Sequence, residues 1–113
     1  MSRIPQQLTM AVIIGNRGFF PSYLVGEARK EAAALFERLG IRSVMLSEQQ
    51  TPLGGVETRQ DAKVCADLLR QHRDEIHGIV VLLPNFGDEK AVAEAIRLSG
   101  LKVPVLIQAE EDN

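Results

Sequence analysis

The sequence has few of the residues that build disulfide frameworks, metal clusters or membrane spans. Its 113 residues include one cysteine, two histidines and no tryptophan. A single cysteine cannot form an intramolecular disulfide, which fits a reducing compartment. The longest apolar runs, Met10 to Ile14 and Ile79 to Leu83, are far shorter than the about 20 residues that cross a bilayer. The N-terminus also lacks the apolar core of a signal peptide. We therefore expect a cytoplasmic protein that does not bind a membrane.

The charge balance also narrows the possible partners. The formal net charge is −2, which argues against nucleic acid, because proteins that bind it usually present a basic surface. The hydrophobic content of 45% and the charged content of 25% are ordinary for a globular protein. The length suits one core, so we expect residues 1–113 to form a single domain.

Apolar residues alternate between two spacings along the chain. Short runs rich in β-branched residues predict strands, and apolar positions three or four apart predict helices. The predicted strands are 9–15, 41–46, 79–83 and 103–107, and the predicted helices are 22–39, 58–75 and 88–99. The order β-α-β-α-β-α-β predicts an α/β fold: an open, doubly wound parallel sheet of at least four strands, flavodoxin-like or Rossmann-like.

Local signals refine this prediction. The run 79–83 is the most apolar and should be central, whereas 41–46 is more polar and should lie nearer an edge. Gly40 and Gly100 should end their helices in the left-handed conformation. Thr58 with Asp61 three residues later resembles a capping box. Because open parallel sheets bind ligands beyond the carboxyl ends of their strands, the loops there are the candidate site.

The first of these loops, GNRGFFP, carries Asn16 and Arg17. The arginine offers a planar fork of donors that suits hydroxyls, carboxylates or phosphates. Only Gly15 and Gly18 are present, so the loop is neither the three-glycine dinucleotide fingerprint nor a P-loop. We expect Asn16 and Arg17 to contact substrate; the alternative is an arginine that is merely solvated.

The loop after the third predicted strand, PNFGDE, offers a second polar surface. Asn85 can donate to and accept from a sugar hydroxyl, and Phe86 can stack on the apolar face of a sugar ring. Turn formation is the alternative for Asn85. Asp88 and Glu89 are better explained as residues that complement a helix N-terminus than as catalytic groups.

One glycine-rich segment and the remaining reactive residues suggest no further catalytic or metal site. The glycine-rich segment 51–58 could close over a ligand, meet a neighbouring subunit or simply connect two elements. His72 and His77 bracket a helix end without an acidic partner at metal spacing, so we expect surface histidines. Cys65 lies on an apolar helix face and should be in the core. We assign no catalytic residue and no metal ligand to this chain.

Three segments together resemble a known family. IIGNRGFFPSYL, then LGGVET before a helix, then PNFGDEKAVAEAI after a strand resemble the N-terminal domain of the L-fucose/L-arabinose isomerase-like family, in its fucose-isomerase-like branch. The resemblance runs from about Met10 to about Ala109. With the sequence ending just after the fourth predicted strand, it leads us to expect the N-terminal domain or a fragment of a longer isomerase.

The resemblance implies a role in sugar isomerisation. Members of the family are cytoplasmic aldose–ketose isomerases that use a divalent metal, usually Mn²⁺, held by carboxylates and a histidine in later domains. They assemble as trimers or hexamers, in which the N-terminal domain of one subunit reaches the active site of its neighbour. Arg17 matches the family's first-loop arginine, and Asn85 resembles its polar position after the third strand. We thus expect a chain that is inactive alone, binds no cofactor itself and orients sugar within a homo-oligomer.

Two other functions fit the residues. The chain could be a non-catalytic sugar-binding module, since half of a two-lobed sugar-binding protein has a similar rhythm of elements. It could also be an assembly domain that makes oligomer contacts without touching ligand.

Overall fold

The computed structural model describes residues 8–15, 23–51, 54–83 and 89–109. They form the predicted alternation: β1 (Thr9–Ile14), α1 (Tyr23–Leu39), β2 (Arg42–Val44), α2 (Arg59–Gln71), β3 (Gly78–Leu83), α3 (Glu89–Ser99) and β4 (Val105–Ala109). The four strands make one sheet in the order β2-β1-β3-β4, and every pairing is parallel. The predicted open parallel α/β fold is confirmed, with β3 inside the sheet and β2 at its edge.

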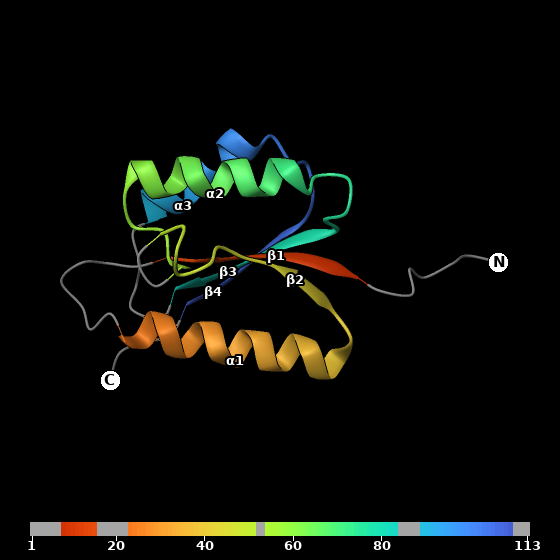
Figure 1. Cartoon of the computed structure of the whole chain (residues 1–113). Coiled ribbons are helices and arrows are strands. Elements are labelled where there is room, and N and C mark those ends of the chain that lie inside the picture. The colour runs from red at the N-terminus through yellow and green to blue at the C-terminus, as the bar shows by residue number, and fades with distance from the viewer. Residues whose placement is uncertain (1–7, 16–22, 52–53, 84–88, 110–113) are drawn as a thin grey trace.

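The helices cover both faces of the sheet (Figure 1), with α1 on one side and α2 and α3 together on the other. On the α1 side, Val25 and Ala32 pack against Val12 and Ile14 of β1. The other side buries the larger cluster, which the two helices form with the opposite faces of β1 and β3; its members include Ile13, Ala62, Cys65, Leu69, Ile79, Val81, Val92 and Ala95. Cys65 is therefore a core residue, as predicted.

The predicted helix signals are confirmed. Gly40 and Gly100 adopt φ of 72° and 70° directly after α1 and α3, a region that glycine enters without a steric penalty. The Thr58 hydroxyl accepts from the Asp61 N–H at 3.1 Å, and the Asp61 carboxylate accepts from the Thr58 N–H at 3.1 Å. This reciprocal pair satisfies two backbone donors that a helix start leaves unpaired.

Several predicted boundaries are wrong by two residues or more. Strand β2 ends at Val44 rather than at residue 46, and β4 ends at Ala109 rather than at residue 107. Helix α2 ends at Gln71 rather than near residue 75, because His72 leaves helical geometry at φ −113° and the next residues form tight turns. Strand β4 pairs from Val105 rather than from Val103. Pro104 has no N–H to give to the ladder and only accepts, from Ile79 N–H at 2.9 Å.

The α1 side of the sheet is only partly covered. Leu35 and Leu39 are 43% and 61% exposed, although their helical spacing places them with the buried Val25 and Ala32. Leu106 of β4 faces this side with its neighbour Val80 and is 64% exposed, whereas Ile107 faces the α2 and α3 side and is 61% exposed. The spacing identified the apolar face of α1 correctly but could not show that one helix covers only part of the sheet.

Candidate functional site

The candidate site lies at the carboxyl ends of β1 and β3, the two central strands. From β1 the chain crosses to β2 on one side of β1, and from β2 it returns to β3 on the other side of β1. Strand order therefore reverses between β1 and β3, the place where open α/β sheets bind ligands. The Gly15 N–H donates to Leu82 O at 2.9 Å, so the two strand ends are held together.

The four predicted substrate-binding residues lie in the loops that leave these two strand ends. Asn16 and Arg17 follow Gly15, and Asn85 and Phe86 follow Leu83; all four lie outside the described residues. What the structure defines is the attachment of each loop: Gly15 and Tyr23 flank the first, and Leu83 and Glu89 flank the second. The loops thus leave adjacent strands and return to helices on opposite faces of the sheet (Figure 1).

A third segment reaches the same edge from the other side of β1. Strand β2 pairs with β1 only from Thr9 to Ala11, which leaves the carboxyl half of β1 without that neighbour. Val56 takes the vacant position: its N–H donates to Ile14 O at 2.7 Å, and it forms a parallel bridge with Gly15. Its side chain is fully buried. The segment before α2 is therefore fixed beside the start of the first loop.

Arg29 of α1 anchors the chain that leads into this segment. Its guanidinium donates to Leu46 O from Nε at 3.3 Å and from Nη2 at 3.1 Å, and Nη1 lies 4.0 Å from a Glu48 carboxylate oxygen. Sequence reasoning did not find this residue. An arginine inside an amphipathic helix belongs to no motif, and only the adjacent Gly54–Gly55 pair hinted that the nearby backbone approaches something closely.

A charged cleft lies between the first turns of α2 and α3. Its lining includes Glu57, Arg59, Lys90 and Glu94. The hydrogen bond from Arg97 lowers the pKa of Glu94, with a smaller effect from the charge of Arg59. Because the cleft combines two acidic and two basic side chains, it has no excess of one sign to select an ionic ligand.

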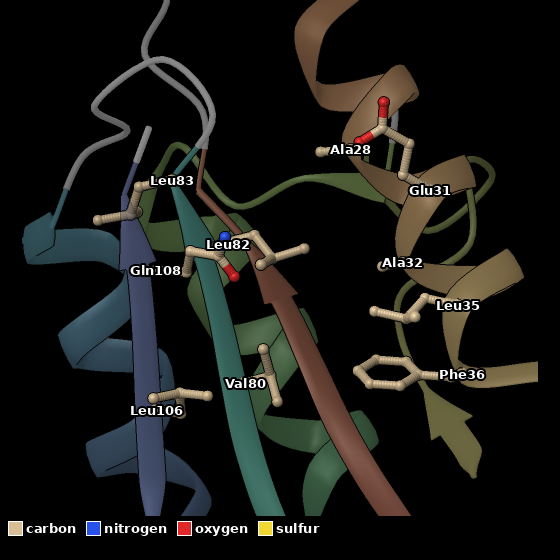
Figure 2. Close-up of a pocket in the computed structure, with 10 residues that line it drawn as sticks. All are labelled: Ala28, Glu31, Ala32, Leu35, Phe36, Val80, Leu82, Leu83, Leu106 and Gln108. Carbon is tan, nitrogen blue, oxygen red and sulfur yellow. The ribbon is translucent and has the colours of Figure 1, made fainter. Parts of the chain in front are cut away.

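A groove beside α1 has the wrong chemistry for a sugar. Figure 2 shows it between α1 and strands β3 and β4. Only Glu31 and Gln108 are polar; the other lining residues are Ala28, Ala32, Leu35, Phe36, Val80, Leu82, Leu83 and Leu106. A polyol needs several convergent donors and acceptors, so this groove is better suited to packing than to sugar binding.

The histidines lie far from the candidate site. His77 Nδ1 accepts from the Thr9 N–H at 3.0 Å, at the start of β1. His72 is 3.4 Å from a carboxylate oxygen of Glu75. Both belong to the amino edge of the sheet, opposite the loops. Within the part of the chain that the structure describes, no three His, Cys, Asp or Glu side chains gather closely enough to hold a metal ion.

Cys65 has the environment of a structural thiol. Burial raises its pKa to about 12, so the nucleophilic thiolate is scarce at neutral pH.

Among the helices of the described ranges, none combines the length and apolar character that a bilayer crossing requires.

The fold defines a class: the open parallel α/β domains, in which ligands commonly bind at the loops after the carboxyl ends of the strands. Residues 11–113 match the fucose/sulfoquinovose isomerase N-terminal domain, which covers nearly the whole chain. The chain therefore belongs to this family of sugar isomerase domains. A search of curated proteins finds no match to it.

Proposed function

We propose that this domain binds and orients the sugar in a metal-dependent aldose–ketose isomerase. The observation that carries the proposal is the family match over residues 11–113, which joins the loops at the strand-order reversal to a sugar isomerase. The substrate is an aldose such as L-fucose or sulfoquinovose, the sugars that the family's description names. The enzyme is cytoplasmic and works as a homo-oligomer.

The polar side chains of the two loops supply the contacts. Arg17 donates to sugar hydroxyls through its guanidinium, and Asn16 and Asn85 offer amide donors and acceptors. Phe86 covers an apolar face of the sugar. Holding the reacting carbons in one geometry lowers the barrier without any proton transfer by these residues, because orientation itself accelerates a reaction.

The divalent metal, Mn²⁺ in this proposal, is held by residues outside this chain. It polarises the two adjacent substrate oxygens when bound. The described residues do not fit such an ion, because they bring together no suitable set of carboxylate and imidazole ligands. We therefore assign to this domain only binding, orientation and exclusion of water, at the active site of a neighbouring subunit.

The test uses the full-length protein that contains this domain. Arg17→Ala should lower kcat/KM for L-fucose or sulfoquinovose, assayed with Mn²⁺, by about 10- to 150-fold, the equivalent of one charged hydrogen bond of about 1.5–3 kcal/mol. Arg38→Ala, an exposed arginine in the last turn of α1, is the matched control and should leave turnover unchanged. Equal turnover in both variants would refute the sugar-orienting role.

Mixing subunits tests whether the site is shared. Arg17→Ala subunits, whose kcat/KM is lowered, are combined with inactive subunits whose metal ligands have been replaced. If the domain of one subunit serves its neighbour's metal, mixed oligomers contain some intact sites and activity returns. If each subunit is self-sufficient, no mixture recovers activity.

A non-catalytic assembly role is the second candidate. The exposed apolar side chains of Leu106 and Ile107 on β4 favour it, with a second copy of the chain as the partner. Leu106→Asp should then change the sedimentation coefficient of the full-length protein, whereas Arg17→Ala should leave both assembly and turnover unchanged.

A further inference from the structure

The loop between β2 and α2 is fixed at both ends beside the candidate site. At its far end, the N–H groups of Glu57 and Thr58 both donate to Asp61 Oδ2, each at 3.1 Å. One residue before Glu57, the Val56 N–H donates to Ile14 O of β1 at 2.7 Å. The backbone of Val56 is thereby held against β1 and against the start of α2 together.

At the end of the loop that follows β2, the Arg29 guanidinium holds the backbone by hydrogen bonds. The two hydrogen bonds from Arg29 to Leu46 O hold a buried residue near the start of the loop; Leu46 is 2% exposed. The donor comes from α1, which begins directly after the first candidate loop. One side chain thus ties the helix that follows the GNRGFFP loop to the segment that borders it.

Gly54 closes this arrangement. It adopts φ of 70°, and a Cβ at this position would lie 2.8 Å from Leu46 O and 2.9 Å from Arg29 Nε. Its N–H donates to Thr51 O at 3.0 Å. The glycine therefore packs directly on the hydrogen-bonded pair, and no side chain fits between them.

From these contacts we infer that Arg29 is a positioning residue for the sugar site, and that segment 54–58 is a fixed wall of that site rather than a lid. The inference rests on the proposed function. The wall borders Gly15, from which the first candidate loop departs, so losing the anchor should loosen the wall and weaken sugar binding. The chemical step itself should be spared, because Arg29 contacts backbone and not the reacting atoms.

Two variants of the full-length protein test the anchor. Arg29→Met keeps the length of the side chain and removes both hydrogen bonds, whereas Arg29→Lys keeps the charge and one donor. The matched control is Arg38→Met, nine residues further along the same helix. Two readouts are needed: KM and kcat for L-fucose or sulfoquinovose with Mn²⁺, and hydrogen exchange at the Val56 amide, with the amide of Val81 in β3 as the internal reference.

We expect Arg29→Met to raise KM by about 3- to 30-fold with kcat within about twofold, the pattern of lost uniform binding. Exchange at Val56 should quicken by about tenfold or more while Val81 is unchanged, because local opening of the loop need not open the core. Arg29→Lys should show smaller changes of both kinds, and Arg38→Met neither.

Each other outcome overturns a defined part. Unchanged Val56 exchange in Arg29→Met refutes the anchor. Faster exchange with unchanged KM leaves Arg29 purely structural and refutes the wall. A wild-type protein that isomerises neither sugar removes the proposed function, and the wall of a sugar site with it, while the exchange measurement still decides whether Arg29 holds the loop.

Discussion

Replacing Gly54 by alanine separates the cost of a left-handed backbone from the cost of a steric clash. Gly40 and Gly100 share its conformation, with φ between 70° and 72° at all three positions. A Cβ at Gly40 or Gly100 would meet nothing within 4 Å, whereas at Gly54 it would meet Leu46 O at 2.8 Å and Arg29 Nε at 2.9 Å. The chain therefore provides two controls that differ from the test position in surroundings alone.

The expected magnitudes follow from these surroundings. Gly40→Ala and Gly100→Ala should each lower the free energy of unfolding by about 1–2 kcal/mol, the penalty for a Cβ in the left-handed region. Gly54→Ala carries the same penalty. It must also displace either a backbone carbonyl or the guanidinium bonded to it, which adds about 1.5–3 kcal/mol for the hydrogen bonds of a charged group. We expect a total of about 3–5 kcal/mol.

The assay is hydrogen exchange on the full-length protein at increasing urea concentration, read at the β1 and β3 amides, because it reports the unfolding free energy of this domain alone. Combining Gly54→Ala with Arg29→Met should cost less than the sum of the single changes, because the Arg29 hydrogen bonds that the new methyl group would disrupt are already absent in Arg29→Met. If Gly54→Ala proves no more destabilising than Gly40→Ala, the loop relaxes freely and the tight packing around Leu46 O has no energetic consequence.

Three further predictions concern stability. Cys65 should resist alkylation by iodoacetamide at pH 8 in the folded protein. Its pKa rises from 9.0 to about 12 on folding, so its contribution to stability is complete below about pH 9 and is lost as the pH rises toward 12. Urea titrations at pH 8 and pH 11 should therefore show a lower free energy of unfolding at pH 11. Thr58→Ala should cost about 1 kcal/mol by removing the helix cap while Thr58→Ser should retain it, and equal losses in both would contradict the capping geometry. Arg42→Ala should cost less than about 1 kcal/mol, because its 2.8 Å ion pair with Glu75 joins side chains that are 48% and 45% exposed; a larger loss in the unfolding free energy would show that this pair is not an ordinary surface pair.

The order of elements was predictable because its signals are local. The run Ile79 to Leu83 carries its own apolar pattern, and Gly40 and Gly100 mark helix ends by conformational preference alone. Errors arose where a local pattern had two interpretations. Val103 and Val105 are equally good strand residues, and the missing N–H of Pro104 decides where pairing starts.

The meeting of the two strand ends was predictable from the sequence, but the contacts that support them were not. Right-handed crossovers between parallel strands bring the carboxyl ends of β1 and β3 to the same side of the sheet. The hydrogen bond from the Gly15 N–H to Leu82 O shows that these two ends are adjacent. The contact of Arg29 with Leu46 O joins residues 17 apart through a side chain and a backbone carbonyl. No sequence periodicity encodes such a contact, because a backbone carbonyl can accept a hydrogen bond in a residue of any type.

The contacts at the amino ends of the strands differ from those at the carboxyl ends, beside the candidate site. At the amino edge, His77 bonds to the backbone of Thr9 and Arg42 pairs with Glu75, so this edge joins neighbouring strands and loops to one another. At the carboxyl edge, the contacts of Arg29, Val56 and Asp61 hold backbone in place just below the candidate loops. Rigid backbone under a binding loop lowers the entropy lost when a ligand is bound. Under the proposed function, these contacts therefore determine how tightly, and in which orientation, the sugar is held.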